Sequence, residues 1–122
     1  GGCDYDTDPT ADPPAGGEPA GDAAEPGFYR KGEPPPADRA LVRSMRRGFT
    51  VLWYGDGARD DVLNGLSERF GRELIVVPRE GLPTTYAVTA WERRLRCDGH
   101  DDAAMARFVD AFRDSGPEKG FL

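Results

Sequence analysis

The chain has 122 residues, a net charge of −6 and 38% hydrophobic residues, which is the size and composition of one small domain. It holds no run of 18 apolar residues, so no transmembrane helix is expected in it. The first 26 residues contain seven acidic and no basic residues, and residues 27–122 are left with a charge of +1. This near-neutral remainder argues against nucleic acid as a partner.

The first 26 residues are rich in Pro, Gly, Ala and Asp, and their only large apolar side chain is Tyr5. Such a segment cannot bury enough apolar surface to offset the entropy lost on ordering. We therefore predict that residues 1–26 form a disordered acidic leader, kept extended by its like charges. Residues 27–122 are then expected to form a single globular domain.

Cys3 follows Gly1-Gly2, precedes the acidic leader, and lies in a sequence that does not begin with Met. This arrangement is typical of the trimmed start of a bacterial lipoprotein, in which Cys3 would be lipidated. The chain would then be exported and held at the outer face of the cytoplasmic membrane or outside the cell. A tag remnant, an ordinary free cysteine and a disulfide from Cys3 to Cys97 are the alternatives; if Cys3 is acylated, Cys97 is expected to be free and buried.

The middle of the chain begins with an extended segment around Pro34-Pro35-Pro36, and a short helix is expected over residues 38–47. Residues 49–54 are β-branched and aromatic between two glycines, which predicts a strand buried on both faces. Residues 58–70 place apolar side chains on one helical face and end at Gly71, which predicts a helix.

The last third of the chain contains two more apolar segments and a second helical pattern. Residues 73–77 and 86–97 are predicted strands, and in the second of these the alternation turns Arg94 and Arg96 toward solvent. Residues 101–113 show one apolar helical face. The order strand, helix, strand, strand, helix predicts a two-layer α/β sandwich, with a small mixed sheet covered on one face by two main helices.

Three stretches occur in an order and spacing that resemble a known family. They are Gly27-Phe28-Tyr29 with Arg43–Gly48, the strand ending in Leu52-Trp53-Tyr54, and Thr89-Ala90-Trp91 through Leu95 to the helix at 107–113. On these residues the chain resembles the exported bacterial family catalogued as domain of unknown function 3105, from about Pro13 to Glu118. The resemblance implies export and no established chemistry.

Members of that family typically carry the motifs Pro-Pro-x-Gly-Gly-Pro-His, Cys-Gly-x-Tyr and His-Ser-Leu-Glu-His-Gly, whose His and Glu residues suggest a metal site. This chain is a divergent member. In it Pro19 and Pro26 replace a His and a Cys, and Arg43, Arg46 and Arg47 replace His, Glu and His. A guanidinium stays protonated and has no lone pair for a metal. The resemblance therefore implies a scaffold that has lost its metal site, and no cofactor is expected.

Arg43, Arg46 and Arg47 form the most distinctive local cluster. They could hold a small anion, such as phosphate, sulfate or a carboxylate, between guanidinium groups. They could instead bind the acidic leader of the same chain, or form a solvated polar face without a ligand. The residue types leave all three interpretations open.

Cys97 and His100 are the remaining candidates for chemistry. A single Cys-x-x-His is a much weaker metal signal than two paired motifs, and a turn that caps a helix accounts for the neighbouring aspartates. A thiol nucleophile also needs a base oriented by a third group, which this spacing does not supply.

The sequence as a whole favours a non-catalytic, exported and lipid-anchored module that binds a partner protein or a small ligand. The alternatives are a small-anion binder that uses Arg43, Arg46 and Arg47, and a thiol enzyme that uses Cys97 and His100.

Overall fold

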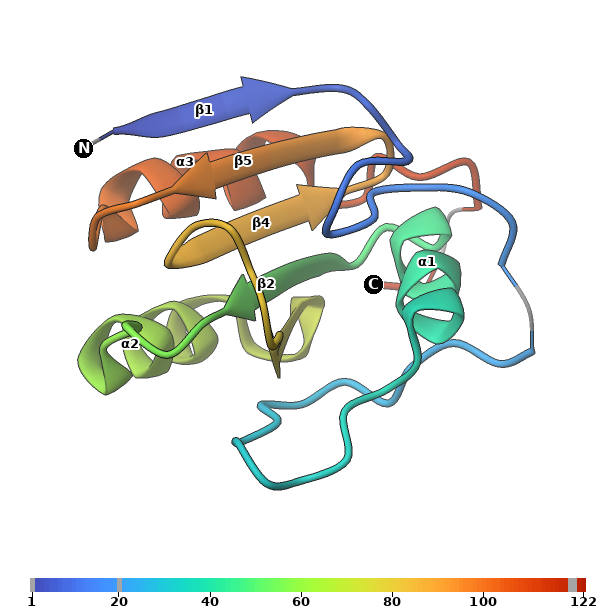
Figure 1. Cartoon of the computed structure of the whole chain (residues 1–122). Coiled ribbons are helices and arrows are strands. Elements are labelled where there is room, and N and C mark those ends of the chain that lie inside the picture. The colour runs from blue at the N-terminus through green and yellow to red at the C-terminus, as the bar shows by residue number, and fades with distance from the viewer. Residues whose placement is uncertain (1, 20, 119–120) are drawn as a thin grey trace.

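The computed structural model describes residues 2–19, 21–118 and 121–122, and in these residues five strands form one mixed sheet with three α-helices packed on it (Figure 1). The strands lie side by side in the order β1-β5-β4-β2-β3. Only the β2–β3 pair is parallel among these neighbours. The elements are β1 (Cys3–Asp6), α1 (Asp38–Arg46), β2 (Thr50–Tyr54), α2 (Asp60–Phe70), the 3-10 turn η1 (Gly71–Glu73), β3 (Leu74–Pro78), β4 (Tyr86–Ala90), β5 (Arg93–Cys97) and α3 (Asp102–Phe112).

The predicted α/β sandwich with a mixed sheet is confirmed, and α2 and α3 share one face of that sheet. Their side chains Leu63 and Phe108 pack in one core with Leu52, Val76 and Val88 from the strands. A second core on the opposite face is covered by α1, which contributes a further layer beyond the two helices expected. It contains Leu41 and Met45 from α1 with Val51, Trp53 and Ile75 from β2 and β3. Cover on both faces explains why every residue of β2 is buried.

The single strand expected over residues 86–97 is divided into the hairpin β4–β5. The strands pair from Tyr86 with Cys97 to Ala90 with Arg93, so Trp91 and Glu92 form the turn. Glu92 adopts a φ of 62°, a left-handed conformation that is uncommon outside glycine. The usual Asn-Gly or Asp-Gly hairpin signal is absent here, and therefore local sequence did not reveal the turn.

The acidic leader differs from the disordered tether that its composition predicts. Residues 3–6 form β1, which pairs with β5 at the edge of the sheet, and Ala15 is fully buried. The cause is Arg94, whose side chain is fully buried and binds the leader. Its Nε donates to the carbonyl of Pro13 at 2.8 Å, and its Nη2 donates to that of Ala11 at 2.9 Å. The leader is thus held through its main-chain carbonyl groups. Every residue has such a group, so the amino-acid composition of the leader does not reveal this interaction.

Arg94 and Arg96 therefore do not face solvent as their alternation suggests. Asp6 of the leader accepts hydrogen bonds from both guanidinium groups. Asp12 pairs with a third arginine, Arg79, which also pairs with Asp38 of α1. The leader is thus part of the folded domain, and the boundary expected at residue 26 does not separate ordered from disordered chain.

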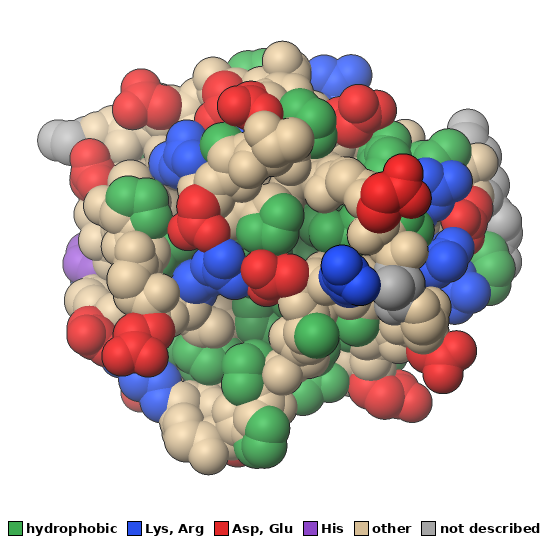
Figure 2. Space-filling view, turned by 45° about the vertical axis from the view of Figure 1, so that its right-hand side comes forward, with side chains coloured by type: hydrophobic (Ala, Val, Ile, Leu, Met, Phe, Trp, Pro, Cys, Tyr) green, Lys and Arg blue, Asp and Glu red, His purple; other side chains and the backbone are tan. Residues whose placement is uncertain are grey.

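Cys3 and Cys97 face each other across β1 and β5 and form a disulfide with an S–S distance of 2.08 Å. A sulfur in a disulfide cannot also carry a thioether-linked lipid, so this bond and the expected lipidation of Cys3 are alternative states of that residue. Among the described residues no helix is long and apolar enough to cross a membrane. Acidic and basic side chains are interspersed over the face shown in Figure 2.

Candidate functional site

The three arginines singled out in the sequence lie at the carboxyl end of α1. Arg43 and Arg46 belong to the last turn of the helix, and Arg47 follows it. Positive charge is favourable there because it faces the negative end of the helix dipole. Leu41 and Met45 of the same helix are buried against the sheet, so the arginines are left at the rim of that core.

One carboxylate, that of Glu118, joins the three guanidinium groups. Oε2 of Glu118 accepts a hydrogen bond from Nη1 of Arg43 at 3.1 Å and from Nε of Arg46 at 2.9 Å. Oε1 lies 3.6 Å from Nε of Arg47, within ion-pair range. The hydrogen bond from Arg46 and the surrounding positive charge lower the pKa of Glu118, so this carboxylate is ionised at neutral pH.

The backbone of the C-terminal segment brings Glu118 to this position. The amide of Glu118 donates to the carbonyl of Arg46 at 2.8 Å, and that of Asp114 donates to the carbonyl of Gly48 at 2.8 Å. Gly116 lies so close to α1 that a Cβ atom there would be 2.2 Å from the carbonyl oxygen of Arg46. Only glycine permits this approach.

Two aromatic rings border the cluster. The guanidinium carbon of Arg46 lies 5.1 Å from the centre of the Trp91 ring, and that of Arg47 lies 4.3 Å from the centre of the Phe121 ring. Such cation–π contacts fix the planes of two of the three guanidinium groups. The result is a cluster of oriented donors around one carboxylate, which we call the arginine site (Arg43, Arg46, Arg47 and Glu118).

Docking of the acidic leader on the arginine site was one of the interpretations left open, and among the described residues no ion pair joins the two. The ion pairs of the leader go to Arg94 and Arg96 of β5 and to Arg79 after β3, and the amide of Ala24 donates to Ser44 Oγ of α1 at 3.0 Å. Beside the arginine site, Arg47 lines an open hollow of about 400 Å³ together with Pro26. Pro26 and Arg47, which the resemblance implies replace a Cys and a His, thus border one space. Among the described residues no group of three His, Cys, Asp or Glu side chains is arranged to hold a metal ion.

Cys97 and His100 do not form a thiol dyad. The sulfur of Cys97 is bonded to Cys3, so it is neither a free thiol nor a thiolate. Nδ1 of His100 lies 2.7 Å from the hydroxyl of Tyr86, and that hydroxyl accepts a hydrogen bond from the amide of Arg59 at 2.9 Å. Burial raises the pKa of Tyr86, so its hydroxyl stays protonated and can donate to His100. Cys97 therefore offers no free thiol to the thiol-enzyme alternative, and His100, through Tyr86, supports the start of α2.

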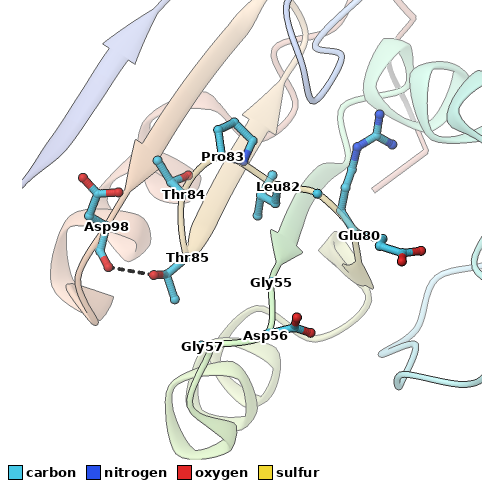
Figure 3. A pocket seen from close by; sticks show the side chains of 11 residues that line it. Gly55, Asp56, Gly57, Glu80, Leu82, Pro83, Thr84, Thr85 and Asp98 are labelled. Atoms are coloured by element: carbon cyan, nitrogen blue, oxygen red, sulfur yellow. Dashed lines mark hydrogen bonds between the residues drawn. The ribbon is translucent and has the colours of Figure 1, made fainter.

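A second, polar hollow of about 380 Å³ lies where the parallel strands β2 and β3 end (Figure 3). The loops after these strands form its walls, and a hydrogen bond of 2.8 Å from Thr85 Oγ1 to the carbonyl of Asp98 closes one side. Ligands of open α/β sheets often bind outside the carboxyl ends of parallel strands. The lining consists of Gly55, Asp56, Gly57, Arg79, Glu80, Gly81, Leu82, Pro83, Thr84, Thr85 and Asp98.

Two residues of structural importance were missed by sequence reasoning. Glu118 lies more than 70 positions from the arginines that it joins, and nothing in the local sequence links them. Arg94 alternates with apolar residues as a solvent-facing side chain would. One weak signal was available: the seven acidic residues of the leader have no basic neighbours within it and could pair with arginines of the domain.

The fold and site define a small, disulfide-linked α/β sandwich whose N- and C-terminal segments are both bound by arginines. Over residues 3–121 the chain matches the model of the family described as protein of unknown function (DUF3105). It belongs to that family, which carries no assigned activity. Neither the curated proteins nor the solved structures contain a match to this chain.

Proposed function

We propose that this chain is a non-catalytic binding module that works outside the cytoplasm. The observation that carries the location is the Cys3–Cys97 disulfide, which uses both cysteines of the chain. Disulfides form and persist in oxidising compartments and are rare in the cytosol. The bond also attaches the leader to the sheet, so oxidation and correct folding are expected to go together.

The location is tested by producing the same chain with and without an added bacterial export signal. The exported chain is expected to react with no thiol reagent under denaturing conditions, and the chain retained in the cytosol is expected to expose two reactive thiols and to melt at a lower temperature. An equal melting temperature and two free thiols in both preparations would count against an extracytoplasmic role.

The absence of catalysis is proposed from what the candidate chemical groups already do. Cys97 is in a disulfide, and His100 contacts Tyr86. The resemblance implies that Arg43 and Arg47 replace two His residues and that Arg46 replaces a Glu. Calorimetric titration with Cu²⁺ and with Zn²⁺ is expected to show no stoichiometric binding. Tight binding of one metal ion per chain would contradict the proposal.

A second, more specific candidate is the binding of a small anion at the arginine site. The observation that favours it is the Glu118 carboxylate, which shows that the three guanidinium groups can converge on one anionic group. The double substitution Arg46→Ala with Arg47→Ala is expected to abolish binding of an anion that the native chain binds. Unchanged binding would show that Arg46 and Arg47 are solvated surface residues and do not bind the anion.

A further inference from the structure

The arginine site has more donors than its resident carboxylate can use. Each guanidinium group carries five N–H groups. Three guanidinium groups surround the two carboxylate oxygens of Glu118. The Nε atoms of Arg43 and Arg47 are buried and have no hydrogen-bond partner among the described residues. Among the described residues only Glu118 forms ion pairs with these three arginines, while Asp22 and Glu25 line the hollow beside Arg47 without pairing with it, so the site has more donors and more positive charge than Glu118 matches.

A tetrahedral oxyanion would meet both shortages. Phosphate offers four oxygens in place of two and carries between one and two negative charges at neutral pH, and a phosphate monoester carries about 1.5 to 2. Charge-assisted hydrogen bonds from guanidinium groups are the strongest that a side chain makes to such an anion. The contacts of Arg46 with Trp91 and of Arg47 with Phe121 hold two of the donors in place without any anion.

The Glu118 side chain can leave the site without unfolding the domain. It is 28% exposed, and the three arginine side chains are 27–32% exposed, so solvent and solutes reach the cluster. The tail is held separately by its backbone, through the amide of Glu118 on Arg46 and the close packing of Gly116. A rotation about side-chain bonds is therefore enough to exchange the carboxylate for another anion.

We propose that the arginine site binds a tetrahedral oxyanion of the phosphate or phosphate-monoester class, and that Glu118 is an internal competitor which this anion displaces. The proposal rests on the anion-binding candidate function and names its ligand class and its regulation. A competing carboxylate on the same chain is present at a high effective concentration, so it sets a threshold that weak monoanions do not pass.

The test is calorimetric titration with inorganic phosphate and, separately, with glycerol 3-phosphate, at low ionic strength and with sodium acetate as the carboxylate control. The proteins are the native chain, Glu118→Gln, and Glu68→Gln as a control that removes one exposed carboxylate from α2. Glu118→Gln is expected to bind phosphate at least about tenfold more tightly than the native chain, because the internal competitor is gone. Glu68→Gln is expected to match the native chain, and acetate is expected to bind none of them measurably.

A further variant tests separately whether Glu118 competes with the anion and whether the arginines bind an anion at all. Adding Arg46→Lys to Glu118→Gln keeps the charge but removes the planar donor pair, and it is expected to lose most of the gained affinity. Equal phosphate affinity in Glu118→Gln and the native chain, with loss on Arg46→Lys, would overturn the competitor and leave the anion site standing. No binding in any folded variant, with folding checked by thermal unfolding, would overturn both.

Discussion

The N-terminal and C-terminal segments of this chain are both bound by arginines, and the two contacts differ in depth and in the atoms that accept. Arg94, which holds the leader, is 0% exposed and donates to two main-chain carbonyls as well as to Asp6. The arginines that hold Glu118 are about one-third exposed and meet one carboxylate. A buried guanidinium without its partners is strongly unfavourable, whereas an exposed ion pair contributes little. The first contact is therefore structural, and the second is suited to exchange.

The largest effect is expected from breaking the disulfide that secures the leader. Cys3 and Cys97 are 94 positions apart, and a bond that closes so long a loop stabilises the folded chain by about 4 kcal/mol. Reduction, or the pair Cys3→Ser with Cys97→Ser, is expected to lower the free energy of unfolding in urea by that amount. A midpoint unaffected by reductant would mean that the disulfide adds no stability beyond that of the leader's other contacts.

Arg94→Ala is expected to destabilise the domain by about 3 kcal/mol, because it removes a fully buried side chain and leaves its acceptors without donors. Limited proteolysis should then cleave the leader in the variant before it cleaves the sheet. The matched control is Arg107→Ala on the exposed side of α3, which should leave both the midpoint and the proteolysis pattern unchanged.

Arg79→Ala is expected to have an intermediate effect of about 1 kcal/mol. Its side chain is 23% exposed, pairs with Asp12 of the leader and Asp38 of α1, and lies 5.0 Å from the centre of the Trp53 ring. Arg79→Lys should recover only part of the loss, because an ammonium cannot pair with both carboxylates and stack on the indole at once. Equal stability of the Ala and Lys variants would show that the planar geometry is unimportant.

The smallest effect on stability is expected at Glu118, and it depends on pH. The folded state lowers the pKa of this carboxyl from 4.5, chiefly through the hydrogen bond from Arg46. Its contribution is therefore present above pH 4.5 and is lost as the pH falls through the lower folded-state pKa. The difference in melting temperature between the native chain and Glu118→Gln should accordingly shrink in acid. A difference that is constant from pH 7 to pH 3 would contradict this ion pair.

The elements of the domain core could be predicted because their patterns are local. The alternation and apolar runs of residues 49–54 and 73–77 and the helical faces of residues 58–70 and 101–113 reappear as β2, β3, α2 and α3 with ends shifted by one or two residues. Binding of the leader to the sheet could not be predicted in this way. It depends on carbonyls of Ala11 and Pro13, which every sequence offers, and on a partner more than 80 positions away.

The sequence by itself determined the α/β class, the core helices and strands, and the arginine cluster at the end of α1, because each follows from spacing within one segment. Only the tertiary structure decided that Cys3 pairs with Cys97, that the leader forms an edge strand over Arg94, and that Glu118 enters the arginine site. These three contacts join residues far apart in the chain. Their formation depends on the relative positions of strands and helices, which composition and periodicity do not specify.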